Sequence, residues 1–368
     1  MESLNINQLA LAWLNSINGI SNRKIDSILD YFNGNTKDLW DNFEVEKYNL
    51  KTLSNKLIAA LSNSKESFEE KIINKLQDEN AHIITIFDES YPKKLKQIAG
   101  APYVLYYKGN IEDIDNLSIA VVGSRKATTY GKFTAEKLTR ELSLLGVNIV
   151  SGLASGIDTV AHKTAIKNNV RTFGIIGCGI NVVYPKSNEK LYSEIVEKNG
   201  AVITEYTFGM EPMPNNFHDR NRIISGLSDG VLVIEAQEKS GTLITAGHAA
   251  NQGKEIFAVP GNIDSFYSKG TNGLIKDGAK ITTSINDIVE EILELKERTN
   301  IKRNYIDYSK LSEQEIIILN CLQSGSKTIF QINEETCLDT GILLSRLTFL
   351  EMKGVIKQIS GNRFILNL

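Results

Sequence analysis

Cysteine, histidine and proline are scarce in this chain, and long apolar runs are missing. Its 368 residues include 3 cysteines, 4 histidines and 6 prolines. The cysteines (Cys178, Cys321 and Cys337) are far apart and form no C-x-x-C pair, so neither a disulfide framework nor a metal site is expected. No run approaches the roughly 18 apolar residues of a membrane span, and residues 1–10 lack the features of a signal peptide. We therefore expect a cytoplasmic protein without membrane contact.

The chain also lacks a strong net charge. Lys and Arg total 41 against 44 Asp and Glu, a net charge of -3 at pH 7. Because the molecule as a whole is not a polycation, a polyanionic partner would have to bind a local basic patch. At roughly 150 residues per domain, the length suggests two or three domains.

The usual nucleotide-binding and hydrolase motifs are absent. The stretch "IAVVGSRKATTYGK", residues 119–132, has the strand–turn–helix layout of a nucleotide site, but Gly123 is followed by Ser124, Arg125 and Lys126. It matches neither G-x-G-x-x-G nor the P-loop G-x-x-x-x-G-K-[ST]. No G-x-S-x-G nucleophile elbow occurs either. These absences argue against a dinucleotide-dependent oxidoreductase, and we predict no cofactor and no catalytic residue.

The composition changes along the chain and suggests its division into domains. All the prolines lie between Pro92 and Pro260, and the flanking regions are rich in helix formers. The pattern of residues 1–80 predicts short amphipathic helices. They could form a helix-hairpin-helix or SAM-like domain, or a helical domain with only a packing role. Residues 82–295 alternate β-rich runs such as "SIAVV" and "GVLVIEA" with helical segments. That alternation is typical of an α/β fold, here an extended Rossmann-like, doubly wound parallel sheet with helices on both faces.

The C-terminal region has a different pattern. Residues 296–310 are polar and lack periodicity, so we interpret them as a linker. Residues 311–368 open with a capping box, Ser312 followed by Glu315. Three helical segments and then a hairpin give the element order of a winged helix. The third helical segment carries few basic residues. This domain could therefore equally well bind a protein or duplex DNA.

Small residues follow many of the predicted strands. In an open parallel sheet, ligands bind outside the carboxyl ends of the strands. Glycine at several of these ends would let a ligand approach the backbone along one edge, and the N-termini of the following helices suit an anion. Arg125 could hold a phosphate with two hydrogen bonds, or it and Lys126 could simply be solvated. The strand-end turns are residues 123–125, 151–158, 177–179, 240–242 and 260–262.

A second group of cations lies in "NNFHDRNRIISGLSDG". Arg220 and Arg222 flank Asn221, and Phe217 precedes them by three residues. Cations beside an aromatic ring suit single-stranded nucleic acid, with charge for phosphates and a ring face for bases. The alternative is structural, with Arg220 paired to Asp229 and Phe217 in the core.

Three ionisable residues resemble catalytic groups at first sight. Asp158 and His162 are four apart and share a helix face, as an acid–base couple would, although a histidine that anchors a helix start is commoner. Glu235 ends a buried strand just before residues 240–242. Its carboxylate could activate water or could cap neighbouring amides.

The ordered motifs resemble those of one family. "VVGSR", "VSGLASGIDTVAH", "GCGINVVYP", "FHDRNRIISGLS", "VIEAQEKSGTLITA" and "FAVPGN" are closely similar to the DNA-processing protein A (DprA, or Smf) family over most of residues 82–295. The resemblance implies a Rossmann-like core without a nucleotide cofactor, whose basic pocket binds single-stranded DNA. It also implies protection of incoming DNA, loading of the RecA recombinase during natural transformation, and a homodimer formed through this domain.

The resemblance extends to individual residues. Ser124 and Arg125 match the family's G-S-R phosphate contact, whereas His218 stands where the family commonly has proline, so the local loop is expected to differ. The R-N-R element and the S-G-[ST] turn are matched as well. The predicted DNA-binding residues are Gly123, Ser124, Arg125, Lys126, Phe217, Arg220, Asn221, Arg222, Gly241 and Thr242.

The same architecture resembles a wider superfamily, which supplies the alternative function. In that superfamily, Glu235 and the turn at residues 240–242 would form the site of a nucleoside-monophosphate phosphoribohydrolase. The sequence lacks the P-G-G-x-G-T-x-x-E run of those enzymes, and it adds flanking domains that a small hydrolase would not need.

Overall fold

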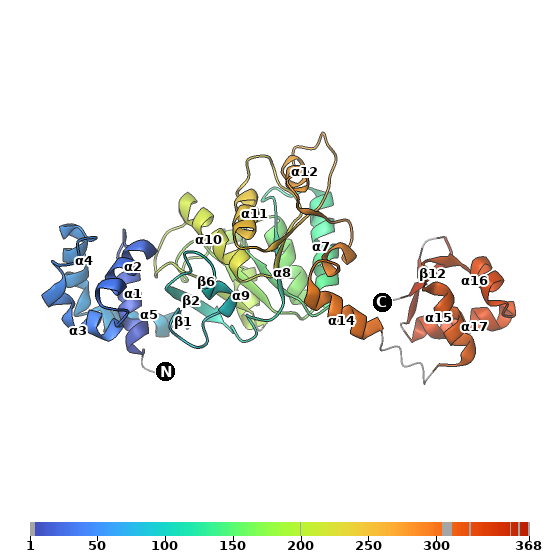
Figure 1. Ribbon diagram of the computed structural model, residues 1–368, viewed down its shortest axis with the longest axis horizontal. Coiled ribbons are helices and arrows are strands. Elements are labelled where there is room, and N and C mark those ends of the chain that lie inside the picture. The colour runs from blue at the N-terminus through green and yellow to red at the C-terminus, as the bar shows by residue number, and fades with distance from the viewer. Residues whose placement is uncertain are drawn as a thin grey trace. The chain divides into compact units, whose positions relative to one another are not determined.

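The chain forms two compact units, residues 1–292 and residues 293–368. The structure is a computed structural model (Figure 1). No helix in the part of the chain that it describes has the length and apolar character to cross a membrane. The described residues are 4–198, 200–303, 311–323, 325–353, 355–359 and 361–366.

A nine-stranded sheet organises the first unit, in the order β1-β2-β6-β5-β4-β3-β7-β8-β9. The strands from β3 to β9 run parallel, which confirms the predicted Rossmann-like α/β fold. β1 and β2 pair antiparallel with each other, and β2 pairs antiparallel with β6, unlike the parallel sheet expected. The connection between β1 and β2 holds only the four-residue helix α6 (Lys93–Lys96), and not the longer helix that usually joins two parallel strands. The strands are β1 (His82–Thr85), β2 (Val104–Gly109), β3 (Ser118–Val122), β4 (Asn148–Ser151), β5 (Thr172–Ile175), β6 (Ala201–Thr204), β7 (Gly230–Val233), β8 (Glu255–Ala258) and β9 (Lys280–Ile281).

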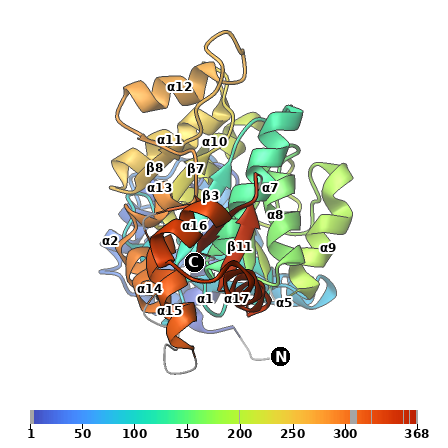
Figure 2. The ribbon, with the colours of Figure 1, turned by 90° about the vertical axis from the view of Figure 1, so that its right-hand side faces the viewer.

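Helices cover both faces of this sheet. Figure 2 shows α7, α8 and α9 on one side of the strands and α10 and α11 on the other. The central strands β3 to β7 are therefore buried along their whole length, as their apolar sequences require. The helices are α7 (Thr129–Leu144), α8 (Ile157–Lys167), the 3-10 turn η1 (Lys186–Asn188), α9 (Glu189–Glu197), α10 (Pro214–Gly226), α11 (Gly241–Asn251), α12 (Lys269–Lys276) and α13 (Asn286–Val289).

The order in which the strands are added to the sheet changes direction at β3, and a crevice forms between β3 and β7 at this point. β3 has β4 on one side, reached through α7, and β7 on the other side, reached only after β6 and α10. The connections that leave the carboxyl ends of β3 and β7 diverge to opposite faces of the sheet. Open α/β sheets bind ligands at such a switch point.

The N-terminal helices pack onto the same unit. The Trp13 side chain is fully buried among them, and their core continues to Tyr106 of β2. Because the helices and the sheet share one apolar cluster, the domain boundary expected near residue 80 stays a prediction. The helices are α1 (Ile6–Asn15), α2 (Asn22–Tyr31), α3 (Thr36–Glu46), α4 (Asn55–Lys65) and α5 (Phe68–Asp78).

The second unit has its own apolar core and a winged-helix-like order of elements. Ser312 and Glu315 form the predicted capping box at the start of α15, and three strands pair in the order β10-β12-β11. α14 makes the first part of the segment interpreted as a linker helical, whereas residues 304–310 of that segment lie outside the described residues. The elements are α14 (Leu293–Arg303), α15 (Glu313–Leu322), β10 (Lys327–Thr328), α16 (Ile329–Thr336), α17 (Thr340–Met352), β11 (Ile356–Ile359) and β12 (Arg363–Leu366).

Candidate nucleic-acid interface

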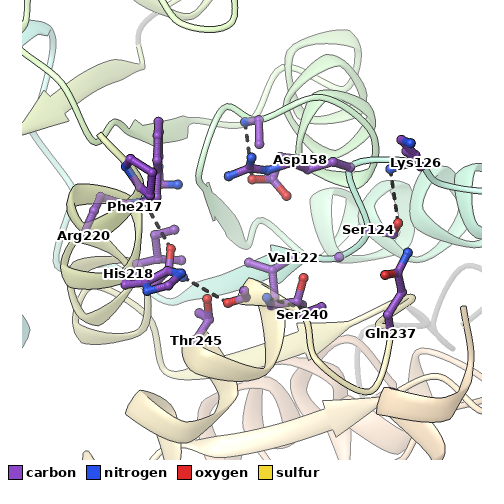
Figure 3. A pocket seen from close by; sticks show the side chains of 18 of the residues that line it. Val122, Ser124, Lys126, Asp158, Phe217, His218, Arg220, Gln237, Ser240 and Thr245 are labelled. Carbon is purple, nitrogen blue, oxygen red and sulfur yellow. Dashed lines mark hydrogen bonds between the residues drawn. The ribbon is translucent and has the colours of Figure 1, made fainter. Parts of the chain in front are cut away.

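A cavity of about 590 Å³ opens at the switch point between β3 and β7 (Figure 3). This volume lies within the usual range for ligand sites in proteins. Every predicted DNA-binding residue except Arg222 contributes to its lining. The lining residues are Val122, Gly123, Ser124, Arg125, Lys126, Ala154, Asp158, Tyr184, Pro212, Pro214, Phe217, His218, Arg220, Asn221, Ile224, Gln237, Ser240, Gly241, Thr242 and Thr245.

The turn after β3 presents two exposed cations. A side chain at Gly123 would collide with Ile157, because its Cβ would lie 2.6 Å from the isoleucine Cγ1. Ser124 is buried, and its Oγ accepts a hydrogen bond from the Lys126 amide at 3.1 Å. The hydroxyl therefore shapes the turn, while the Arg125 and Lys126 side chains project into solvent.

Arg125 lies over an aromatic ring and has no carboxylate partner among the described residues. Its guanidinium carbon is 5.4 Å from the centroid of the Phe217 ring, and the Tyr184 ring lies 5.5 Å from the same ring. Gly177 leaves room for this arrangement, since a Cβ there would be 2.9 Å from the Phe217 Cδ1. An exposed, unneutralised guanidinium beside aromatic faces can bind both a phosphate and a base.

Arg220 supplies a buried charge beneath these rings. It is 4% exposed, and its Nη1 donates to the carbonyl oxygens of Gly152, at 2.7 Å, and Ile175. These bonds tie α10 to the carboxyl ends of β4 and β5. Burial lowers the Arg220 pKa to about 10, so the group keeps its charge at neutral pH. The alternative pairing with Asp229 does not form, because that carboxylate binds Lys94 at 2.5 Å.

Asp158 stabilises the same corner of the pocket. Its carboxylate accepts hydrogen bonds from the amides of Gly152 at 3.0 Å and Ala154 at 3.4 Å. Burial raises its pKa, and the nearby positive charge of Arg220 opposes that shift. A Cβ on Gly152 would lie 2.7 Å from the Arg220 Nη2 and 2.8 Å from the Asp158 Oδ2. Glycine is therefore required between the two charged groups.

The N-terminus of α11 forms another wall. Ser240 is the N-cap, and its Oγ accepts a hydrogen bond from the Thr242 amide at 3.2 Å. Asn221 Nδ2 donates to the Gly241 carbonyl at 3.1 Å, which fixes the turn against α10. Nothing lies within 4 Å of a Cβ built on Gly241. The start of this helix is thus open to an anion from the cavity side.

Arg222 differs from the expectation for a DNA contact. Its guanidinium forms two hydrogen bonds to the carboxylate of Glu205, at 2.5 and 2.6 Å, and one to the Gly100 carbonyl at 3.0 Å. It does not line the cavity. On a helix, residues two positions apart face different directions, so the R-N-R spacing sends only Arg220 and Asn221 toward the pocket.

Glu235 and His162, which resembled catalytic groups in the sequence, form contacts that stabilise the fold. Glu235 accepts hydrogen bonds from the amide of Thr128 at 3.0 Å and from its hydroxyl at 2.5 Å, so it caps the start of α7. His162 is fully buried, and its Nδ1 bonds to the Thr172 hydroxyl at 2.7 Å. Burial lowers the His162 pKa to about 3. Asp158 and His162 therefore form hydrogen bonds with different partners and not with each other.

Sequence reasoning missed Tyr184 as part of the site. It lies in the turn after β5, in "INVVYP", where an aromatic residue follows a glycine-containing strand end. That context could have indicated a ring at the rim. No group of His, Cys, Asp or Glu within the described ranges has the arrangement of a metal site.

Comparison with known proteins identifies the family. Residues 82–293 match the model of DNA recombination-mediator protein A. The DNA processing protein DprA of Streptococcus pneumoniae is 43% identical over 207 residues (56% of this chain, 73% of that protein), and that of Bacillus subtilis is 42% identical over 240 residues (64% and 80%). Protein Smf of Escherichia coli is 40% identical over 217 residues, and the chain spans only 58% of its length.

Solved structures agree with this match. An X-ray structure of DNA processing protein A from Streptococcus pneumoniae superposes with a TM-score of 0.67 at 34% identity, covering 79% of this chain and 99% of that one. The Helicobacter pylori protein, described for its single-stranded DNA binding mode, gives a TM-score of 0.53 at 31% identity and covers 58% and 96%. The chain thus belongs to the DNA recombination-mediator protein A family.

Proposed function

We propose that the cavity binds the backbone and bases of single-stranded DNA. The observation that carries this proposal is Arg125, an exposed guanidinium without an ion pair in the described part of the chain, placed over Phe217. A single strand offers phosphates for the cation and unstacked bases for the rings. The single-stranded DNA binding mode described for the Helicobacter pylori relative supports the same assignment here.

The shape of the site favours a strand over a free nucleotide. A mononucleotide gathers its phosphates at one point, and its sites usually pack glycines closely around them. Here Arg125 lies over Phe217, Lys126 lies at the end of the cavity away from Phe217 (Figure 3), and the open start of α11 forms another wall. Cations and amides spread along a crevice suit successive phosphates.

We further propose that the chain acts without catalysis. The carboxylate that a phosphoribohydrolase would need, Glu235, is occupied by the amide and hydroxyl of Thr128. That contact gives no support to the alternative function. Nucleoside monophosphates incubated with the protein should release no free base.

In the cell, we propose that the protein protects incoming single strands and loads RecA recombinase onto them during natural transformation, in the cytoplasm. We also propose that it forms a homodimer through residues 82–295. Family membership supports each of these roles. Light scattering at micromolar concentration should give the mass of a dimer, and a monomer that still loads recombinase would contradict this.

A salt titration tests the central proposal. Binding of a fluorescent oligothymidylate and of a matched duplex is measured by anisotropy at several salt concentrations. We expect tighter binding to the single strand at every concentration, and an affinity that falls with salt because phosphate contacts release counterions. Equal or tighter binding to duplex would refute the proposal.

A further inference from the structure

Three large aromatic side chains are exposed near the pocket and are not needed for the core. Tyr130 is 54% exposed, Phe133 is 66% exposed and Phe266 is 58% exposed. Tyr130 and Phe133 are three positions apart on α7 and share its outer surface. The opposite surface of that helix, with Ala135 and Leu138, packs on the sheet. We name Tyr130, Phe133 and Phe266 the aromatic rim.

The aromatic rim is held together at the carboxyl edge of the sheet. The Tyr130 hydroxyl donates a hydrogen bond to the Pro260 carbonyl at 3.3 Å, which ties α7 to the segment that follows β8. The Tyr267 carbonyl accepts a hydrogen bond from the Ala236 amide at 2.9 Å, which ties the far end of that segment to the turn after β7. Figure 2 shows the segment before α12 beside the start of α7. Phe266 lies between these two anchors.

This surface continues from the pocket. Lys126 and Gln237 line the cavity, and in Figure 3 they lie at the end away from Phe217 and His218. α7 begins three residues after Lys126, and Gln237 directly follows Ala236, which binds the loop of Phe266. A strand that leaves the pocket between Lys126 and Gln237 therefore meets the aromatic rim next.

The charges around the aromatic rim favour a polyanion. Its two segments and the neighbouring turns carry exposed lysines that form no ion pair with a described residue. Fewer carboxylates than cations lie on the same segments. The lysines are Lys126, Lys132, Lys239 and Lys269, and the acidic residues are Glu136, Glu238 and Asp264.

From these observations we infer that the aromatic rim is a second subsite for the same single strand. The pocket holds a few nucleotides, and Tyr130, Phe133 and Phe266 stack bases farther along. The inference rests on the proposed function and extends it. Stacking of bases on exposed rings tolerates any sequence, because every base has an aromatic face, so the subsite would add affinity with strand length and not with sequence.

The length dependence of binding tests this inference. Affinities are measured for oligothymidylates of about 4 and about 20 nucleotides, the shorter to fill the pocket alone. In the Phe133→Ala/Phe266→Ala double variant, we expect unchanged affinity for the short strand and a loss of about tenfold or more for the long one. Tyr48→Ala is the matched control, since Tyr48 is 75% exposed on the N-terminal helices, and it should change neither affinity.

A spectroscopic variant gives an independent readout. Phe133→Trp should keep a large ring at the site and report stacking by fluorescence quenching, measured against the wild-type background of Trp13 and Trp40. We expect added quenching with the long strand and little with the short one.

Each result has a definite meaning. If wild-type protein binds neither strand, the proposed function fails. If it binds both and the double variant keeps its full affinity for the long strand, the pocket stands and the second subsite is wrong. If the double variant changes only the mass measured by light scattering, the aromatic rim is a contact between protein copies and the inference is likewise overturned.

Discussion

The three arginines predicted for the site have three different surroundings. Arg125 is exposed over Phe217, Arg220 is buried among backbone carbonyls, and Arg222 is paired with Glu205. A charge in solvent contributes to ligand binding and little to folding, whereas a buried or paired charge contributes mainly to folding. Substitution at each position should therefore give a distinct result.

Arg125→Ala should weaken DNA binding and leave stability unchanged. Loss of a charge-assisted contact with a phosphate should cost about 1.5–3 kcal/mol, roughly a ten- to hundredfold drop in affinity. The salt dependence should become shallower by about one phosphate. Anisotropy at two salt concentrations and thermal melting measure both effects.

The matched control is Arg140→Ala, an exposed arginine farther along α7. It should behave like the wild type in both measurements. Unchanged affinity in Arg125→Ala, or a loss accompanied by a lower melting temperature, would mean that the Arg125 side chain is structural.

Arg220→Met should chiefly destabilise the fold. The substitution leaves the carbonyls of Gly152 and Ile175 and the buried carboxylate of Asp158 without their cation, and such a loss typically costs about 3–5 kcal/mol. Denaturation by urea measures the free energy of unfolding. A fully stable variant with abolished DNA binding would instead make Arg220 a direct phosphate contact.

At the scale of elements, α8 is fastened to β5 through His162 and Thr172. The His162 pKa is lowered from 6.5 to about 3 because the ring is buried. The folded state thus prefers neutral histidine. Its stabilising contribution is complete above pH 6.5 and is lost as the pH falls toward 3.

From this shift we predict that acid weakens the fold through His162. Between about pH 7.5 and pH 5, the free energy of unfolding should fall by about 2 kcal/mol from this group alone. Asp158 acts in the opposite sense, since its raised pKa favours folding as the pH falls. His162→Asn should therefore remove the destabilising slope, as measured by urea denaturation at both pH values. An identical pH dependence in the variant would contradict the assignment.

The sequence patterns predicted the secondary-structure elements more accurately than the contacts between their side chains. Short apolar runs such as "SIAVV" and "GVLVIEA" predicted most of the strands of residues 82–295, and the signal is clearest from β3 to β7, because burial on both faces demands a continuous apolar sequence. The two-residue β9 carries no such signal. The contacts of Arg222 with Glu205 and of Glu235 with Thr128 could not be predicted, since each joins elements that meet only when the sheet is assembled. Because of those contacts, the Arg222 side chain lies outside the site and the Glu235 carboxylate caps the start of α7.

At the scale of the whole molecule, the candidate site lies entirely within residues 1–292. A chain truncated after Ile292 should bind an oligothymidylate with an affinity within about threefold of the full-length value, since no described lining residue is lost. Anisotropy with both proteins at matched salt tests this. A loss well beyond threefold would assign part of the single-strand site to the C-terminal unit.

The buried position of Arg220 also has a kinetic consequence. Its guanidinium is fixed by hydrogen bonds to Gly152, Ile175 and Asn221, so it cannot swing out to meet a ligand. The charge nevertheless lies below an open cavity with low-dielectric walls, and such a geometry focuses the electric field into the solvent above it. Arg220 should thus attract a strand toward the cavity from a distance, and its influence should appear in the association rate constant.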